Sequence, residues 1–240
     1  MDCDDIILLD GIFNSFNHII KYDLDIVQFH TVWQYQNAIK LQTCFYKYNN
    51  IIYQPILSYI FFYDDQNYHH GNELNFALWD KLIKTDIINK AFQFIGDKYV
   101  KQNIFINNDS TILFAIFKVA NSYHYINEIG YFYFRNNKNS TQNSWNNPKL
   151  KEIVINGLLL NLQFFYEKTK DTYLDKFYCI FKIEQYYKRF TKLFVDLKNE
   201  EYNYIINVID KLLNLNYISN TEKLKIFKIK ILILNMKQTE

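Results

Sequence analysis

Apolar positions recur at helical spacing near the start of the chain. They are Leu9, Ile12, Phe13, Phe16, Ile19 and Ile20. Steps of three and four residues bring such positions to one face of a helix, so we predict an amphipathic helix over residues 5–21. The acidic residues at its start suit the positive end of the helix dipole.

Runs rich in β-branched and aromatic residues alternate with further helical patterns up to residue 135. The predicted elements are a strand at 25–30, an irregular segment or short helix at 33–48, a helix at about 78–92 that is either continuous or split in two at Thr85-Asp86, a helix at 108–121, and strands at 123–126 and 131–135. This alternation is typical of an α/β protein.

A change in composition separates the two parts of the chain. Residues 136–148 are dense in Asn, Ser and Lys and end with one of the two prolines. Such a stretch marks a boundary. Residues 150–236 then show several apolar stripes at helical spacing. We therefore predict one domain over residues 1–148 and an all-α region over 149–240.

Composition limits the classes of function. Of 240 residues, 49% are hydrophobic and 22% charged, which allows a sizeable core. A net charge of +2 gives no strong electrostatic footprint for nucleic acid. The odd set of cysteines, Cys3, Cys44 and Cys179, argues against a disulfide framework and favours a reducing compartment. No apolar run is long enough to cross a membrane. We expect a location in the cytoplasm or on the cytoplasmic face of a membrane.

Four short blocks carry the candidate chemistry. They are Asp2-Cys3-Asp4-Asp5, Trp79-Asp80-Lys81-Leu82-Ile83-Lys84, Asn108-Asp109-Ser110-Thr111 and the segment from Tyr125 to Arg135. Each is unspecific alone. In this order and approximate spacing they resemble the family 2 glycosyltransferases, over residues 1 to about 145.

The resemblance implies a fold and a donor. It implies the C-terminal half of an A-type nucleotide-sugar domain, followed here by an all-α appendage. It also implies that a nucleotide-binding half of roughly sixty to ninety residues would precede Asp2. The partners would be a nucleotide-sugar donor and a glycan, lipid or protein acceptor.

The resemblance assigns the acidic block to a metal diphosphate. A hard cation, Mn²⁺ or Mg²⁺, would neutralise the charge that grows on the leaving diphosphate. Asp4 is then the metal ligand, and Asp2 lies near the nucleotide ribose or the metal. We expect Asp5 to cap the following helix. The alternative is a solvated acidic segment with no ligand.

The third block supplies the candidate base. An acceptor hydroxyl must lose a proton as it attacks the anomeric carbon. Asp109 matches the aspartate that serves as this base in inverting members of the family, while Asn108 stands where the family has glutamate. The change from glutamate to Asn108 would affect how the acceptor is positioned. The alternative is that both residues merely cap a helix.

The remaining blocks supply candidate binding residues. Trp79 has a face suited to stacking on a sugar, and Lys81 would contact a phosphate or the acceptor. Arg135 would approach the diphosphate. The alternatives are a core tryptophan with a surface lysine, and a surface arginine.

Two functions follow as expectations. The first is metal-dependent transfer of a sugar by single displacement, with inversion. The second is a catalytically inactive, truncated remnant that serves as an interaction module or has no function. Lysines interleaved with apolar residues near the C-terminus also allow peripheral contact with an anionic membrane, although a solvated face on a packing helix explains them too.

Overall fold

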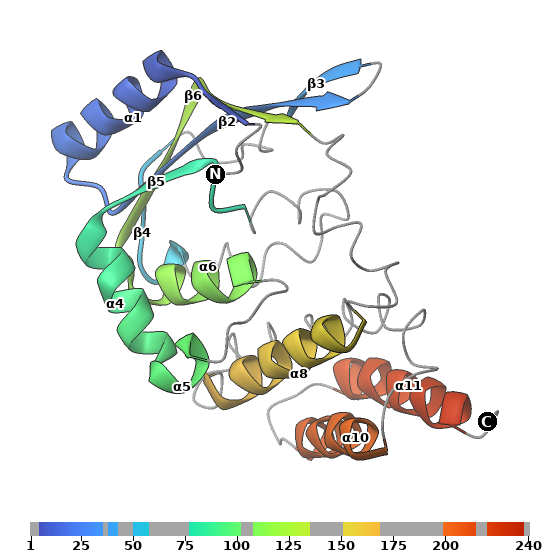
Figure 1. Cartoon of the computed structure of the whole chain (residues 1–240). Coiled ribbons are helices and arrows are strands. Elements are labelled where there is room, and N and C mark those ends of the chain that lie inside the picture. Colours follow the sequence, from blue (N-terminus) through green and yellow to red (C-terminus); the bar gives the residue numbers. More distant parts are fainter. Residues whose placement is uncertain are drawn as a thin grey trace. The chain divides into compact units, whose positions relative to one another are not determined.

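The computed structural model describes residues 5–35, 38–42, 50–57, 77–101, 108–134, 151–168, 199–214 and 220–237 (Figure 1). The chain divides into two compact units. Unit 1 comprises Met1–Gln102 and Asn108–Asn143, and unit 2 comprises Asn103–Asn107 and Ser144–Glu240.

Unit 1 combines a sheet with helices, which confirms the predicted α/β class. Its strands are β1 (Ile6–Ile7), β2 (Ile26–Tyr35), β3 (Ala38–Gln42), β4 (Ile52–Tyr53), β5 (Lys81–Ile83) and β6 (Ser122–Phe134). Its helices are α1 (Leu9–Tyr22), α4 (Thr85–Ile95), α5 (Asp97–Val100) and α6 (Asn108–Val119).

The two long strands β2 and β6 form the centre of the sheet and run parallel. Each is flanked on its outer side by two short antiparallel strands. β5 pairs with the first part of β2 and β3 with its second part, whereas β4 pairs with the start of β6 and β1 with its end. The sheet is therefore mixed, with parallel pairing only at its centre among the described strands.

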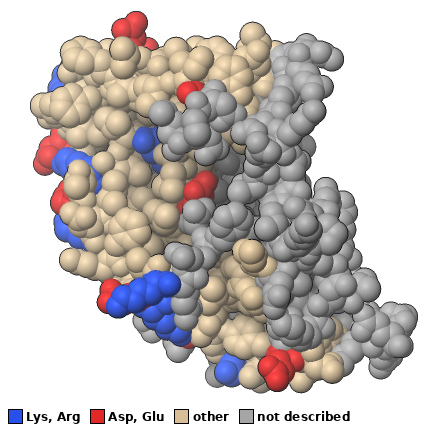
Figure 2. All heavy atoms as spheres, in the orientation of Figure 1, with Lys and Arg blue, Asp and Glu red and all other residues tan. Residues whose placement is uncertain are grey.

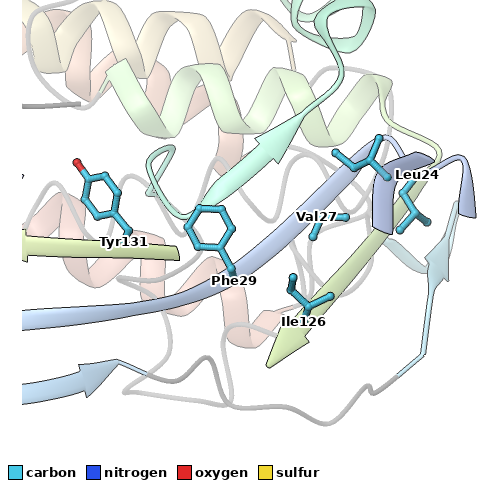
Figure 3. Close-up of a cluster of buried hydrophobic side chains, with 6 residues drawn as sticks. Leu24, Val27, Phe29, Ile126 and Tyr131 are labelled. Atoms are coloured by element: carbon cyan, nitrogen blue, oxygen red, sulfur yellow. The ribbon is translucent and has the colours of Figure 1, made fainter. Parts of the chain in front are cut away.

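Helices cover both faces of the sheet (Figure 1). α1 lies on one side and α4 and α6 on the other. One buried apolar cluster of unit 1 combines residues of β2 and β6 with one residue of α1 and one of the turn after it (Figure 3). It consists of Ile19, Leu24, Val27, Phe29, Ile126 and Tyr131. Alternation along a strand sends the intervening residues to the opposite face.

Gly11 lets α1 approach the sheet closely. A Cβ on Gly11 would lie 2.2 Å from the carbonyl oxygen of Ile129 and 2.7 Å from Gly130 Cα. No side chain fits at such distances. The backbones of α1 and β6 are therefore in direct contact at this point, and Gly130 in turn leaves room for the Phe29 ring, which would lie 2.5 Å from a Cβ there.

The start of the first helix differs from the prediction. The helix begins at Leu9, because Ile6 and Ile7 pair with Phe132 and Tyr131 of β6 as strand β1. These two residues pair with partners that lie 126 and 124 positions later in the sequence. The helix ends at Asp23, which adopts a left-handed conformation with φ 51°.

Three other predictions about elements need correction. The segment 33–48, expected to be irregular or a short helix, contains the end of β2 and all of β3, which form a hairpin. The helix expected at 78–92 is preceded by β5 and begins only at Thr85. The two strands expected at 123–126 and 131–135 are one strand, β6, whose pairing with β2 contains irregularities.

Unit 2 is helical where it is described. Its helices are α8 (Lys151–Lys168), α10 (Asn199–Leu213) and α11 (Asn220–Lys237), and α10 packs against both others. None of the helices in the described part of the chain has the length and apolar character needed to span a bilayer. Acidic and basic side chains are interspersed over the described part of the face shown in Figure 2.

Candidate functional site

Asp5 is held at the end of β6 by two hydrogen bonds. The Tyr131 hydroxyl donates to its Oδ2 at 2.6 Å, and the backbone N–H of Phe134 donates to its Oδ1 at 3.0 Å. The backbone N–H of Leu8 donates to Gly130 O at 3.0 Å. These bonds fix the chain immediately after Asp4.

The cap predicted for Asp5 is therefore wrong. The residue before the first helical position is Leu8, and no side chain caps that helix. The Asp5 carboxylate is used instead to join the acidic segment to β6, because β1 separates it from the helix.

Trp79 lies in a stack of aromatic rings. Its ring centroid is 5.2 Å from that of Tyr131 at an interplanar angle of 18°, and 5.2 Å from that of Tyr133 at 8°. Trp33 meets Trp79 edge-on at 6.2 Å and Tyr133 at 5.4 Å. Trp79 is half-buried and packs against the core of unit 1. The stack places Trp79 directly against Tyr131, the residue that holds Asp5.

A chain of buried polar groups links β6 and β2 to the tryptophan segment, residues 79–84. The Tyr123 hydroxyl donates to Gln28 Oε1 at 2.7 Å, and Gln28 Nε2 donates to Asp80 Oδ2 at 2.7 Å. Asp80 Oδ1 accepts from the Lys81 ammonium at 2.6 Å, which also donates to Ala77 O at 2.7 Å. Each group in this chain has a partner, as burial requires.

Lys81 is thus neither a surface residue nor open to solvent. Its side chain is 0% exposed and forms an ion pair with Asp80, whose side chain is 1% exposed. Burial raises the pKa of Asp80, and the Lys81 charge and the hydrogen bonds from Lys81 and Gln28 oppose that rise. Contact between this ammonium and a phosphate would require the ion pair to open, and that contact stays a prediction.

Asp109 lies in the first turn of α6 and is half-buried. The next two residues, Ser110 and Thr111, are buried with 4% and 2% exposure. The helix predicted to open at Asn108 is confirmed. The helix that carries Asp109, α6, packs on α4. Asp5 and Trp79, in contrast, both contact Tyr131 of β6.

Three candidate residues lie outside the described residues, namely Asp2, Asp4 and Arg135. Asp2 and Asp4 precede the fixed residue Asp5, and Arg135 directly follows the last residue of β6. Within the described ranges, no group of three or more His, Cys, Asp or Glu side chains forms a metal site.

Of the residues in these contacts, the sequence had assigned binding roles to Trp79 and Lys81 but missed others. It assigned no role to Gln28, Trp33 or Asp80. Gln28 and Trp33 carry no sequence signal, because their partners come from distant parts of the chain. Asp80 carried a weak signal, since an acid and Lys81 that stand side by side before the apolar residues Leu82 and Ile83 can be buried only as a pair.

The sequence matches no protein-family model and no curated protein.

Proposed function

We propose that this chain acts as a metal-dependent glycosyltransferase. It would move a sugar from a nucleotide-sugar donor to a glycan, lipid or protein acceptor by single displacement. The odd cysteine set of the sequence favours a reducing location, in the cytoplasm or on the cytoplasmic face of a membrane.

One observation carries the proposal. Three of the four sequence blocks meet at one point of unit 1, although they are far apart in the chain. Asp5 and Tyr131, separated by 126 positions, share a hydrogen bond, and Trp79 stacks on Tyr131. Blocks that only resemble a family by chance have no reason to converge in space. Their convergence supports the proposal that the acidic segment, the tryptophan segment and the end of β6 form one site.

The donor set suits a hard divalent cation. Asp4 would hold Mn²⁺ or Mg²⁺ together with diphosphate oxygens, and Asp2 would contact the ribose or the metal. Both oxygens of Asp5 already accept hydrogen bonds, which supports the assignment of the ligand to Asp4. When bound, the cation neutralises charge on the leaving diphosphate.

The other residues would act on the acceptor and donor. Asp109 takes the proton from the acceptor hydroxyl. At the same time the oxygen of that hydroxyl bonds to the anomeric carbon, and the bond between this carbon and the diphosphate oxygen breaks. Trp79 contacts a sugar through its accessible surface, and Arg135 approaches the diphosphate. Lys81, whose ammonium is paired with Asp80, would contact a phosphate or the acceptor once that ion pair opens.

Thermal denaturation of the full chain with Mn²⁺ and uridine or guanosine diphosphate tests the proposal. At ligand concentrations about 100 times Kd, binding adds about 2.7 kcal/mol to the unfolding free energy. We expect Tm to rise by roughly 5–10 °C only when both ligands are present. Asp4→Asn should lose this rise, whereas Asp10→Asn, an acid on the exposed surface of α1, should keep it. No rise with any combination of ligands would contradict the proposal.

A second experiment tests the base. Asp109→Asn should retain the Mn²⁺-dependent binding of the nucleotide and lose sugar transfer, because the amide cannot accept a proton. Asp97→Asn, an exposed acid in the first turn of α5, is the matched control and should transfer normally. Normal turnover by Asp109→Asn would exclude it as the base.

A specific observation favours the alternative, an interaction module without catalysis. Four large apolar residues of α1 are exposed along one stripe: Leu9, Phe13, Phe16 and Ile20, at 78%, 64%, 51% and 64%. Exposed apolar stripes of this kind are typical of interaction surfaces. A chain that shows no ligand-dependent stabilisation, and whose binding to another protein is lost in Phe13→Gln, would support this alternative.

A further inference from the structure

The last helix of the chain is apolar on two opposite sides. On one side, Ile226 and Ile229 are buried, and α11 packs against α10. Lys230 on this helix forms an ion pair with Asp210 of α10. Packing within unit 2 therefore explains the apolar residues on this side of α11.

The other side of α11 is exposed. Its stripe consists of Leu224, Phe227, Ile231 and Leu234, which are 54%, 48%, 40% and 38% exposed. At about 100° per residue, these four residues fall within an arc of about 80°. A helix that packs on its neighbour with one side does not require large apolar residues on the other.

Lysines border this stripe on both sides. On the helical wheel, Lys223 lies about 20° beyond one edge and Lys228 about 40° beyond the other. Lys223 is half-buried and Lys228 is exposed. From Lys223 to Lys237 the sequence contains five lysines and no acidic residue. Lys230 is paired with Asp210, and the helix also contains Glu222, so the charges that border the apolar stripe are those of Lys223 and Lys228.

We propose that α11 binds an anionic lipid surface and lies in the plane of the membrane interface. The apolar stripe would enter the boundary between headgroups and acyl chains, and the lysines at both edges would reach the lipid phosphates. Charge complementarity selects this occupant. A second copy of the same face would bring lysines against lysines. The inference does not depend on the proposed enzymatic function.

The stripe on α1 offers an internal comparison. It has the same number of exposed apolar residues, but an acid, Asp10, lies in its first turn and a lysine only in its last. If exposed apolar residues alone caused lipid binding, both α1 and α11 would bind the lipid surface. If lysines beside the apolar stripe are also needed, only α11 would bind it.

The experiment is co-sedimentation of the full chain with vesicles of phosphatidylcholine alone, or of phosphatidylcholine with phosphatidylserine. We expect binding only to vesicles that contain phosphatidylserine. Each lysine near an anionic surface contributes roughly a factor of five to the binding constant, so Lys223→Gln with Lys228→Gln should weaken binding about 25-fold. Phe227→Gln should weaken it at least about ten-fold, because the ring leaves the lipid.

Phe13→Gln on α1 is the matched control and should change binding less than about two-fold. Circular dichroism shows whether each variant keeps its helices, and Leu224→Gln provides a second test of the stripe. Equal binding to both kinds of vesicle, or no binding to either, would overturn the proposal. It would also be overturned if Phe227→Gln changed the oligomeric state but left the affinity for vesicles unchanged, because the stripe would then be a protein interface.

Discussion

Replacing Gly11 by alanine tests how closely α1 packs on β6. Alanine at an interior helical position is normally more stable than glycine by about 1 kcal/mol. At Gly11, however, the new Cβ would lie 2.2 Å from Ile129 O and 2.7 Å from Gly130 Cα. Ordinary contacts between such atoms lie at about 3.5 Å. The helix would therefore have to move outward by more than about 1 Å.

The atoms that the Cβ meets belong to backbone, so they cannot rotate away. Ile129 and Gly130 lie within β6, which is paired with β2 along most of its length. Overpacking in a core costs about 1–3 kcal/mol, and a backbone obstacle places this site at the upper end. After the gain in helix propensity, we expect a net loss of about 2 kcal/mol in the free energy of unfolding, which corresponds to a Tm lower by roughly 4–8 °C.

Urea denaturation followed by tryptophan fluorescence measures this loss, because Trp33 and Trp79 both lie in unit 1. Asn17→Ala is the matched control. It lies on the same helix but is exposed, so it should leave stability unchanged or raise it by up to about 0.7 kcal/mol. If Gly11→Ala were as stable as the wild type, α1 would not lie this close to β6, and the inferred position of Asp5 would fail with it.

Further predictions concern the buried ion pair and the Asp5 hydrogen bond. Lys81→Met should cost about 3–5 kcal/mol at neutral pH because it leaves the Asp80 carboxylate buried without its cation, and adding Asp80→Asn should recover most of the loss. Burial raises the pKa of Asp80 above its ordinary 3.8, so the folded state keeps this proton to higher pH than the unfolded chain. The unfolding free energy should therefore fall as pH rises through the window just above 3.8, and it should fall more steeply in Lys81→Met. Urea midpoints measured over a pH series test this expectation. A series without such a fall would contradict the raised pKa of Asp80. Tyr131→Phe should cost about 1.5–3 kcal/mol by removing the hydrogen bond to Asp5, and it should lose its effect when Asp5 is already Asn, which a double-mutant cycle checks.

The sequence by itself predicted the α/β class and the elements whose signal is local. The helix at α6 follows from a polar first turn and an apolar run, and its start at Asn108 agrees with the structure. The start of β2 follows from its β-branched run. These elements need little information beyond their own residues.

Other elements depend on partners that the sequence does not reveal. Ile6 and Ile7 fit a helical pattern, yet they are a strand because β6 has an edge to pair with there. Residues 38–42 became β3 because β2 supplies a hairpin partner. β6 continues through Asn127–Gly130, which looks like a turn, because its parallel neighbour holds both halves. Pairing between distant segments overrides local preference in such cases.

The candidate site divides in the same way. The order of the four blocks could be recognised along the chain, because spacing is a property of the sequence. Only the tertiary structure decided that Asp5 bonds to Tyr131, that Trp79 stacks on the same ring and that Lys81 is buried against Asp80. The physical reason is that a carboxylate, a ring or an ammonium ion is satisfied by whichever partner the fold brings within a few ångströms, and this choice is made by packing across the sheet rather than by neighbours in the chain.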